Sequence, residues 1–230
     1  MILSHTHKFI FLCNGKTGTS SIESALDEYQ EGAEFETAVD GLYTPKHIPP
    51  AALRALLGPS LWEEYFIFVF VRNPWDWFVS QYFWNQEPAP VSKRRALLHP
   101  IEAVTRYQRK QEERRRLRTL ETFSRTDIRE TYDLLRQYRG IYEAESLFQY
   151  HYAYAPDGTK LVDFVGRFER INRDFDRVME HLGLDAELPH RNPTDHRGYR
   201  SYYTDDTAAM IRDLYAIDVE TFGYTFEDDG

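Results

Sequence analysis

Two runs of mostly apolar residues stand out along the chain, at residues 8–13 (KFIFLC) and 66–71 (FIFVFV). Runs of this length without polar alternation are typical of strands that helices cover on both faces, as in parallel sheets. A shorter run at residues 161–165 is a third candidate strand. The pattern therefore predicts an α/β fold with three layers, in which helices flank a parallel sheet.

Segments with helical spacing alternate with these strands. Residues 49–58 (PPAALRALLG) carry proline where a helix begins and glycine after its end. Residues 171–184 (INRDFDRVMEHLGL) place apolar side chains at helical intervals, and Gly183 is expected to end that helix. A further helix is predicted for residues 205–215, followed by an aromatic and acidic tail.

Charge is concentrated in one part of the chain. The net charge is −9, but residues 93–139 contain 14 basic and 7 acidic residues and carry +7, which leaves −16 elsewhere. This segment lies within residues 86–150, which we interpret as a helical insertion in a single domain of residues 1–230. A basic insertion on an acidic body can attract an anionic acceptor, although a solvated pair of charged helices has the same composition.

The composition argues against a membrane or secreted protein. No apolar run reaches the roughly 18 residues of a membrane span, and the first residues lack the basic and apolar regions of a signal peptide. Cys13 is the single cysteine, so it has no partner for an internal disulfide. We expect a cytoplasmic protein with neither a membrane nor a nucleic acid as its partner.

A glycine-containing turn connects the first strand to a helix, in the sequence CNGKTGTSSIESAL at residues 13–26. A strand, turn and helix in this order place backbone N–H groups and the positive end of a helix around one point, as in P-loop folds. Gly15 and Gly18 allow a close backbone approach, and Lys16 supplies a positive charge. Hydroxyl groups for phosphate oxygens are available from Thr17, Thr19 and Ser21.

The start of this helix has a capping signature. Ser20 followed by Glu23 three residues later matches a capping box, so Ser20 is predicted to be the N-cap. The buried stripe of the helix is then expected to consist of Ile22, Ala25, Leu26 and Tyr29.

The turn does not have the Walker spacing of nucleoside triphosphatases. That pattern requires a glycine five residues before the Gly-Lys pair, and this position is Ile10. We also find no convincing strand-borne aspartate for Mg²⁺. A P-loop kinase-like phosphotransferase remains the alternative enzyme class, and it requires ATP and a metal.

A second candidate anion site follows the strand at 66–71. Arg72 ends that strand, Pro74 can begin a helix, and Ser80 falls about two turns into it. Two anion sites at the carboxyl ends of two parallel strands suggest a nucleotide with two separated phosphate groups. We expect Trp75, Phe78, Val79 and Tyr82 to be core, and Trp77 and Trp84 to line an acceptor cleft.

These motifs resemble the sulfotransferase superfamily, most closely its carbohydrate branch, sulfotransferase family 2. KTGTSS resembles the loop for the 5′-phosphosulfate of 3′-phosphoadenosine-5′-phosphosulfate (PAPS), and RNPWDWFVSQY resembles the 3′-phosphate segment. VDFVGRFERINRDF, LPHRNPTDHRGYRSYYTDD and LYAIDVETFGY are similar to later family blocks, so the resemblance covers most of the chain outside 86–150. One departure is Trp77, where many members have arginine.

The resemblance implies transfer of a sulfuryl group from PAPS to a hydroxyl or amine, without a metal. Lys16 would stabilise charge on the leaving phosphate oxygen, and His47 is the favoured general base, with Lys46 as its backup. The other implied nucleotide-binding residues are Thr17, Gly18, Thr19, Ser20 and Ser21 for the 5′ side, Arg72 and Ser80 for the 3′-phosphate, and Arg197 or Arg200 from a covering loop.

The acceptor and the activity itself have alternatives. A glycan or another hydroxylated molecule is the expected acceptor, and the basic segment favours an anionic one. A non-catalytic module that binds a nucleotide or anion is the alternative to an enzyme. Arg167 and Glu169 are interpreted either as contacts to the site or as an ion pair before the next helix.

Overall fold

The computed structural model describes residues 1–31, 48, 50–86, 148–189 and 198–228. Within these ranges a four-stranded sheet has the order β1-β2-β3-β4. β2 pairs in parallel with β3, and β3 pairs in parallel with β4, whereas β1 is antiparallel to β2. The strands are β1 (Ile2–Ser4), β2 (Phe9–Leu12), β3 (Phe66–Val71) and β4 (Phe164–Arg167).

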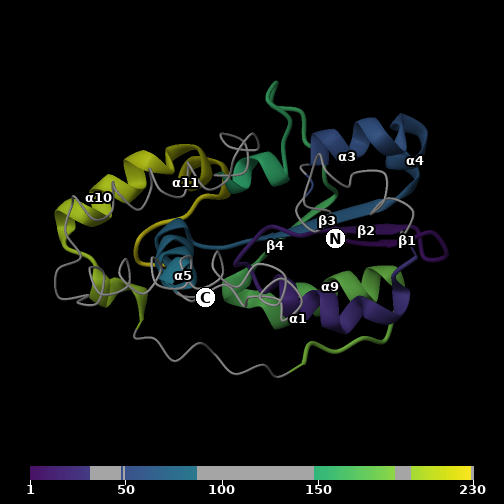
Figure 1. The fold of residues 1–230 in the computed structure, drawn as a ribbon, viewed down its shortest axis with the longest axis horizontal. Coiled ribbons are helices and arrows are strands. Elements are labelled where there is room, and N and C mark those ends of the chain that lie inside the picture. Colours follow the sequence, from purple (N-terminus) through teal and green to yellow (C-terminus); the bar gives the residue numbers. More distant parts are fainter. Residues whose placement is uncertain (32–47, 49, 87–147, 190–197, 229–230) are drawn as a thin grey trace, which may run out of the picture.

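Helices cover both faces of this sheet, which confirms the predicted α/β class and its three layers (Figure 1). One face packs against α1 (Thr19–Leu26) and α9 (Ile171–Leu182). The opposite face packs against α3 (Pro50–Leu57) and α4 (Pro59–Glu64). Beyond the carboxyl ends of the parallel strands lie α5 (Pro74–Gln86), α10 (Asp205–Leu214) and α11 (Ala216–Phe222).

Successive strand residues supply the two faces alternately, because side chains along a strand point to opposite sides. Phe11 and Phe68 lie in the cluster with α1 and α9, while Leu12 and Val69 lie in the cluster with α3 and α4. All four are at most 1% exposed. Each such side chain contributes roughly 1.5–3 kcal/mol of burial free energy, so the central strands need apolar residues at every position.

Most predicted elements are confirmed, with some shifted ends. The third strand begins at Phe164 instead of residue 161, because the N–H of Leu161 donates to the carbonyl of Ala153 and not to the sheet. The helices at 50–57, 171–182 and 205–214 agree with prediction, and Gly183 ends α9 in the left-handed conformation. Strand β1 and helices α4 and α11 were not predicted.

Among the described residues, no helix is both long and apolar enough to cross a membrane. Most of the predicted insertion at 86–150 lies outside those residues, and its helical character stays a prediction.

A buried carboxylate anchors the chain where it returns to the described part at residue 148. Asp218 on α11 is fully buried, and it accepts the N–H groups of Gln149 at 3.0 Å and Tyr150 at 2.8 Å. These residues begin the short helix η6 (Gln149–Tyr152). Burial raises the pKa of Asp218 from 3.8 to about 7, despite the two hydrogen bonds, which lower it.

The raised pKa predicts a specific pH dependence of stability. The folded state holds the Asp218 proton more tightly than the unfolded chain, so this contribution is complete below about pH 4 and is lost as pH rises through about 7. The wild-type advantage over Asp218→Asn in free energy of unfolding should therefore shrink by about 1–3 kcal/mol between pH 5 and pH 7.5. Urea denaturation at both pH values measures it, and a constant difference would contradict the assignment.

Candidate functional site

The loop between β2 and α1 is held by hydrogen bonds to its own carbonyl groups. The carbonyl of Asn14 accepts the hydroxyls of Thr17 at 2.8 Å and Thr19 at 2.5 Å. Both threonines are buried, and their hydroxyl protons are used within the loop. What Thr17 and Thr19 offer to a ligand is therefore their backbone N–H, not the hydroxyl donors that the sequence suggested.

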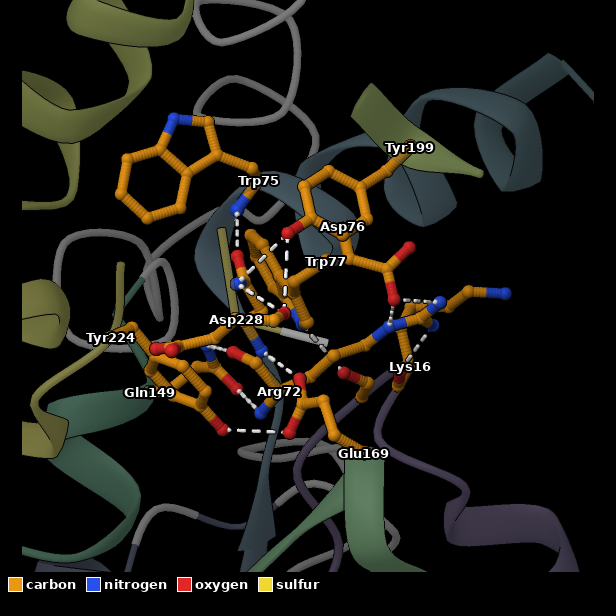
Figure 2. Close-up of polar contacts among 12 residues, drawn as sticks. Lys16, Arg72, Trp75, Asp76, Trp77, Gln149, Glu169, Tyr199, Tyr224 and Asp228 are labelled. Atoms are coloured by element: carbon orange, nitrogen blue, oxygen red, sulfur yellow. Dashed lines mark hydrogen bonds and ion pairs between the residues drawn. The ribbon is translucent and has the colours of Figure 1, made fainter. Parts of the chain in front are cut away.

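The next two carbonyls are held by side chains that follow β3 (Figure 2). The indole N–H of Trp77 donates to the carbonyl of Gly15 at 2.8 Å, and Nη1 of Arg72 donates to the carbonyl of Lys16 at 3.1 Å. In a trans peptide the C=O and the following N–H point in opposite directions. Fixing these carbonyls therefore also fixes the N–H groups of Lys16 and Thr17.

Consecutive N–H groups at this turn find no acceptor in the described part of the chain. Among the described residues, none accepts the backbone N–H of Thr17, Gly18, Thr19 or Ser20. Lys16 and Gly18 have left-handed φ values of 66° and 80°, which bend the loop into the start of α1. Backbone N–H groups in such a turn, at the positive end of a helix, make an anion-binding concavity.

The helix cap differs from the predicted one. Gly18 is the N-cap of α1, and its carbonyl accepts the N–H groups of Ser21 at 2.9 Å and Ile22 at 3.2 Å. The predicted Ser20–Glu23 capping box is wrong, because Ser20 already lies inside the helix and no side chain caps it. Glu23 instead accepts a hydrogen bond from Cys13 at 3.1 Å and pairs with the N-terminal amino group of Met1.

Gly18 also packs closely against the segment before α9. A Cβ atom at Gly18 would lie 2.3 Å from Cδ1 of Ile171 and 3.3 Å from Phe168. A Cβ at Gly15 would make only an ordinary contact, 3.8 Å from Gln81. The close backbone approach predicted for both glycines is found at Gly18, where the neighbours are residues of the protein itself. Gly15 has room for a Cβ atom.

Arg72 joins the loop to the start of α5. Its guanidinium is buried, lies 4.1 Å from the centre of the Phe168 ring, and binds Asp76 through Nε at 2.8 Å and Nη2 at 2.7 Å. With Nη1 bound to Lys16, three of its five N–H donors are used. One N–H on each terminal nitrogen remains without an acceptor among the residues that the structure describes.

Ser80 lies one turn beyond Asp76 on the same face of α5, because residues four apart are neighbours on a helix surface. The Ser80 side chain is 6% exposed, and its hydroxyl makes no hydrogen bond with any described residue. The Ser80 oxygen is not among the fully buried atoms that lack a partner, so the hydroxyl reaches the surface and can contact a ligand. Ser80 is therefore a candidate ligand contact next to the Arg72–Asp76 pair.

A buried amide connects the two strands that carry these groups (Figure 2). The side chain of Gln149 accepts the N–H of Arg72 at 2.8 Å and donates to the carbonyl of Arg72 at 2.7 Å. It also accepts a hydrogen bond from Asn14 at 3.1 Å. The ends of β2 and β3 are thereby held side by side, which places the loop at 14–20 beside Arg72.

The predicted Arg167–Glu169 ion pair is absent among the described contacts, and each residue binds another element. Glu169 accepts the backbone N–H of Asn73 and the hydroxyl of Tyr224, and burial raises the pKa of its carboxyl. Arg167 donates to the carbonyl of Phe222 and lies over the Tyr224 ring. These contacts hold residues 222–224 close to Asn73 in the β3–α5 turn.

The tryptophans of α5 are core residues as far as they are described. Trp75, Phe78 and Val79 are buried, as predicted. Trp77 is 1% exposed, so the expectation that it lines an acceptor cleft is wrong. The side chains of Tyr82 and Trp84 lie outside the described part of the structure.

The remaining predicted site residues bind other groups or lie outside the described residues. Arg200 in η8 (Tyr199–Tyr202) donates to the carbonyls of Phe226 at 3.3 Å and Glu227 at 2.6 Å. Its nucleotide contact stays a prediction. His47 and Arg197 lie outside the described residues, and their roles stay predictions as well.

Several residues of the cluster were missed by the sequence reasoning. Asp76 stands four residues after Arg72 on a predicted helix, and that spacing could have indicated the pair. Asn14 and Gln149 gave no local signal, because their partners are distant in the sequence. Phe168 could have been noted only as an aromatic residue after a strand.

Comparison with known families identifies the class of protein. A protein-family model with the description "Sulfotransferase family" matches residues 1–225, nearly the whole chain. The protein therefore belongs to the sulfotransferase family, in the family 2 branch that its motifs resemble. Searches of curated proteins and of solved structures gave no match.

Replacing Gly18 with alanine should destabilise the protein by more than the strain of a left-handed alanine alone, because the new Cβ also meets Ile171. Gly18→Ala adds a left-handed alanine and a contact with Ile171, and we expect a loss of about 1–3 kcal/mol in free energy of unfolding. Gly183→Ala is the matched control, since Gly183 also has a left-handed φ, 65°, but nothing within 4 Å of an added Cβ. Equal losses in urea denaturation would contradict the packing role.

Proposed function

We propose that this protein transfers a sulfuryl group from PAPS to a hydroxyl or amine of an acceptor, with a glycan as the preferred candidate. Membership of the sulfotransferase family supports sulfuryl transfer as the class of reaction. The donor, the acceptor class and the residue roles given below are parts of the proposal.

The observation that carries the proposal is the proximity of two unlike anion sites. The N–H groups of residues 17–20, which no described residue accepts, begin one residue after Lys16, whose carbonyl is bound to Arg72. The second candidate site consists of the Arg72 N–H groups that no described residue accepts and of the Ser80 hydroxyl. A nucleotide with a 5′-phosphosulfate and a separate 3′-phosphate needs two neighbouring anion sites of this kind.

Each side of the proposed site has a distinct task. The N–H groups of residues 17–20 hold the 5′-phosphate in a fixed orientation, which lowers the entropic cost of the reaction. The Lys16 ammonium stabilises negative charge on the phosphate oxygen when the bond to sulfur breaks. PAPS supplies an activated sulfuryl group whose leaving group is a phosphate.

The acceptor needs a base to remove its proton as the new bond to sulfur forms. His47 is the proposed general base, since its pKa range suits proton transfer near neutrality. The basic segment at 93–139 is the proposed surface for an anionic acceptor. A cytoplasmic location also remains a prediction from the sequence.

The donor can be tested by calorimetry without metal, using adenosine 3′,5′-bisphosphate, ADP and ATP. We expect preference for the 3′,5′-bisphosphate. Ser80→Ala should lower that affinity on the order of tenfold, because a hydrogen bond to a charged group is lost, and leave ADP binding unchanged. The free energy of unfolding of Ser80→Ala should equal that of the wild type, since the Ser80 hydroxyl makes no hydrogen bond to a described residue.

Arg72→Ala is a less selective companion variant. Arg72 also binds the Lys16 carbonyl and Asp76, so its loss should weaken both phosphate positions. Binding of ATP only with Mg²⁺, and no preference for the 3′-phosphate, would overturn the proposed donor in favour of a phosphotransferase.

The catalytic residues can be separated from the binding residues by turnover. His47→Ala should reduce kcat on the order of 10² to 10⁴ and leave bisphosphate affinity nearly unchanged. Lys16→Met should also reduce kcat, and it should weaken bisphosphate binding by a smaller factor than it reduces kcat. Single-turnover assays with PAPS and a hydroxylated acceptor measure both effects, and unchanged turnover in His47→Ala would remove it from the mechanism. Binding without any transfer in the wild type would favour a non-catalytic module.

A further inference from the structure

Trp77 contacts the loop at 15–20, the proposed phosphate loop, without being accessible to a ligand. Its side chain is 1% exposed, and its ring packs edge-on against Tyr215 with centroids 5.7 Å apart. Its indole N–H donates to the carbonyl of Gly15 at 2.8 Å (Figure 2). A core side chain on α5 therefore ends in a hydrogen bond to the loop before α1.

This hydrogen bond acts on the peptide that connects Gly15 to Lys16. The peptide is planar, so holding its carbonyl fixes the direction of the Lys16 N–H and the point from which the Lys16 side chain departs. Lys16 has a left-handed φ of 66°, a conformation that non-glycine residues rarely adopt. Without a donor at Gly15, the loop loses one of the contacts that support this conformation, although Arg72 still holds the Lys16 carbonyl.

We propose that Trp77 is a positioning residue that holds the loop at 15–20 in the conformation required for the 5′-phosphate of the nucleotide. The inference rests on the proposed function, because it concerns the 5′ half of the same site. It predicts that the Trp77 N–H affects the binding of the 5′-phosphate and leaves the binding of the 3′-phosphate unchanged.

The chain contains a matched control two residues away. Trp75 is also on α5, is 3% exposed, and donates its indole N–H to the carbonyl of Ala208 at 2.8 Å. Ala208 belongs to α10, not to the phosphate loop. Trp75→Phe and Trp77→Phe therefore remove the same type of hydrogen bond and the same ring volume from similarly buried positions.

The test compares adenosine 3′,5′-bisphosphate with adenosine 3′-monophosphate by calorimetry. The ratio of the two affinities isolates the contribution of the 5′-phosphate. In Trp77→Phe we expect this ratio to fall about five- to tenfold, with 3′-monophosphate affinity within about twofold of the wild type. In Trp75→Phe the ratio should remain at the wild-type value, although its stability falls to a similar extent.

A second variant keeps the test independent of folding. Replacing Trp77 with 3-benzothienylalanine substitutes sulfur for the N–H and keeps the size of the bicyclic ring. The same selective loss is expected there. An unchanged ratio in this variant, or equal weakening of both nucleotides, would overturn the positioning role. If the wild type binds adenosine 3′,5′-bisphosphate no more tightly than adenosine 3′-monophosphate, the proposed function fails, and the inference fails with it.

Discussion

The side-chain amide of Gln149 is the constraint on which the site depends. It pairs with both backbone groups of Arg72 and accepts a hydrogen bond from Asn14. Unpaired backbone groups in this buried position would each cost on the order of 1–3 kcal/mol. Gln149 therefore joins the residues that follow β2 and β3, alongside the direct hydrogen bond from Asn14 to the carbonyl of Phe70, and Asp218 holds Gln149 in turn.

With the strand ends fixed, the carbonyl groups of the loop bind residues of the protein, whereas several of its N–H groups do not. The carbonyls of residues 14–16 bind Thr17, Thr19, Trp77 and Arg72 inside the protein. Among the residues that the structure describes, none accepts the N–H groups of residues 17–20, which the proposed function assigns to a ligand. Because Asp76 already balances the charge of Arg72, the proposed site would attract an anion largely through fixed dipoles and Lys16.

The elements with local causes could be predicted from the sequence. The continuous apolar run of β3, the spacing of α9 and the glycine turn after β2 each follow from neighbouring residues. The capping box failed because tertiary contacts decided the helix start: the left-handed Gly18 packs against Ile171, a residue far along the chain. Trp77 was misplaced for a similar reason, since its partner Gly15 belongs to another element.

The two proposed anion positions are mechanically linked, because residues at the start of α5 and along it belong to both. Arg72 precedes this helix and binds the Lys16 carbonyl, Trp77 lies in its first turns and binds the Gly15 carbonyl, and Ser80 follows on the same helix. A helix is stiff over this length, so the spacing between the loop and Ser80 cannot be adjusted independently at either end. Under the proposed function, a ligand with phosphates at one particular separation is favoured for that reason, and selectivity for such a nucleotide would follow from the rigidity of α5 as well as from charge.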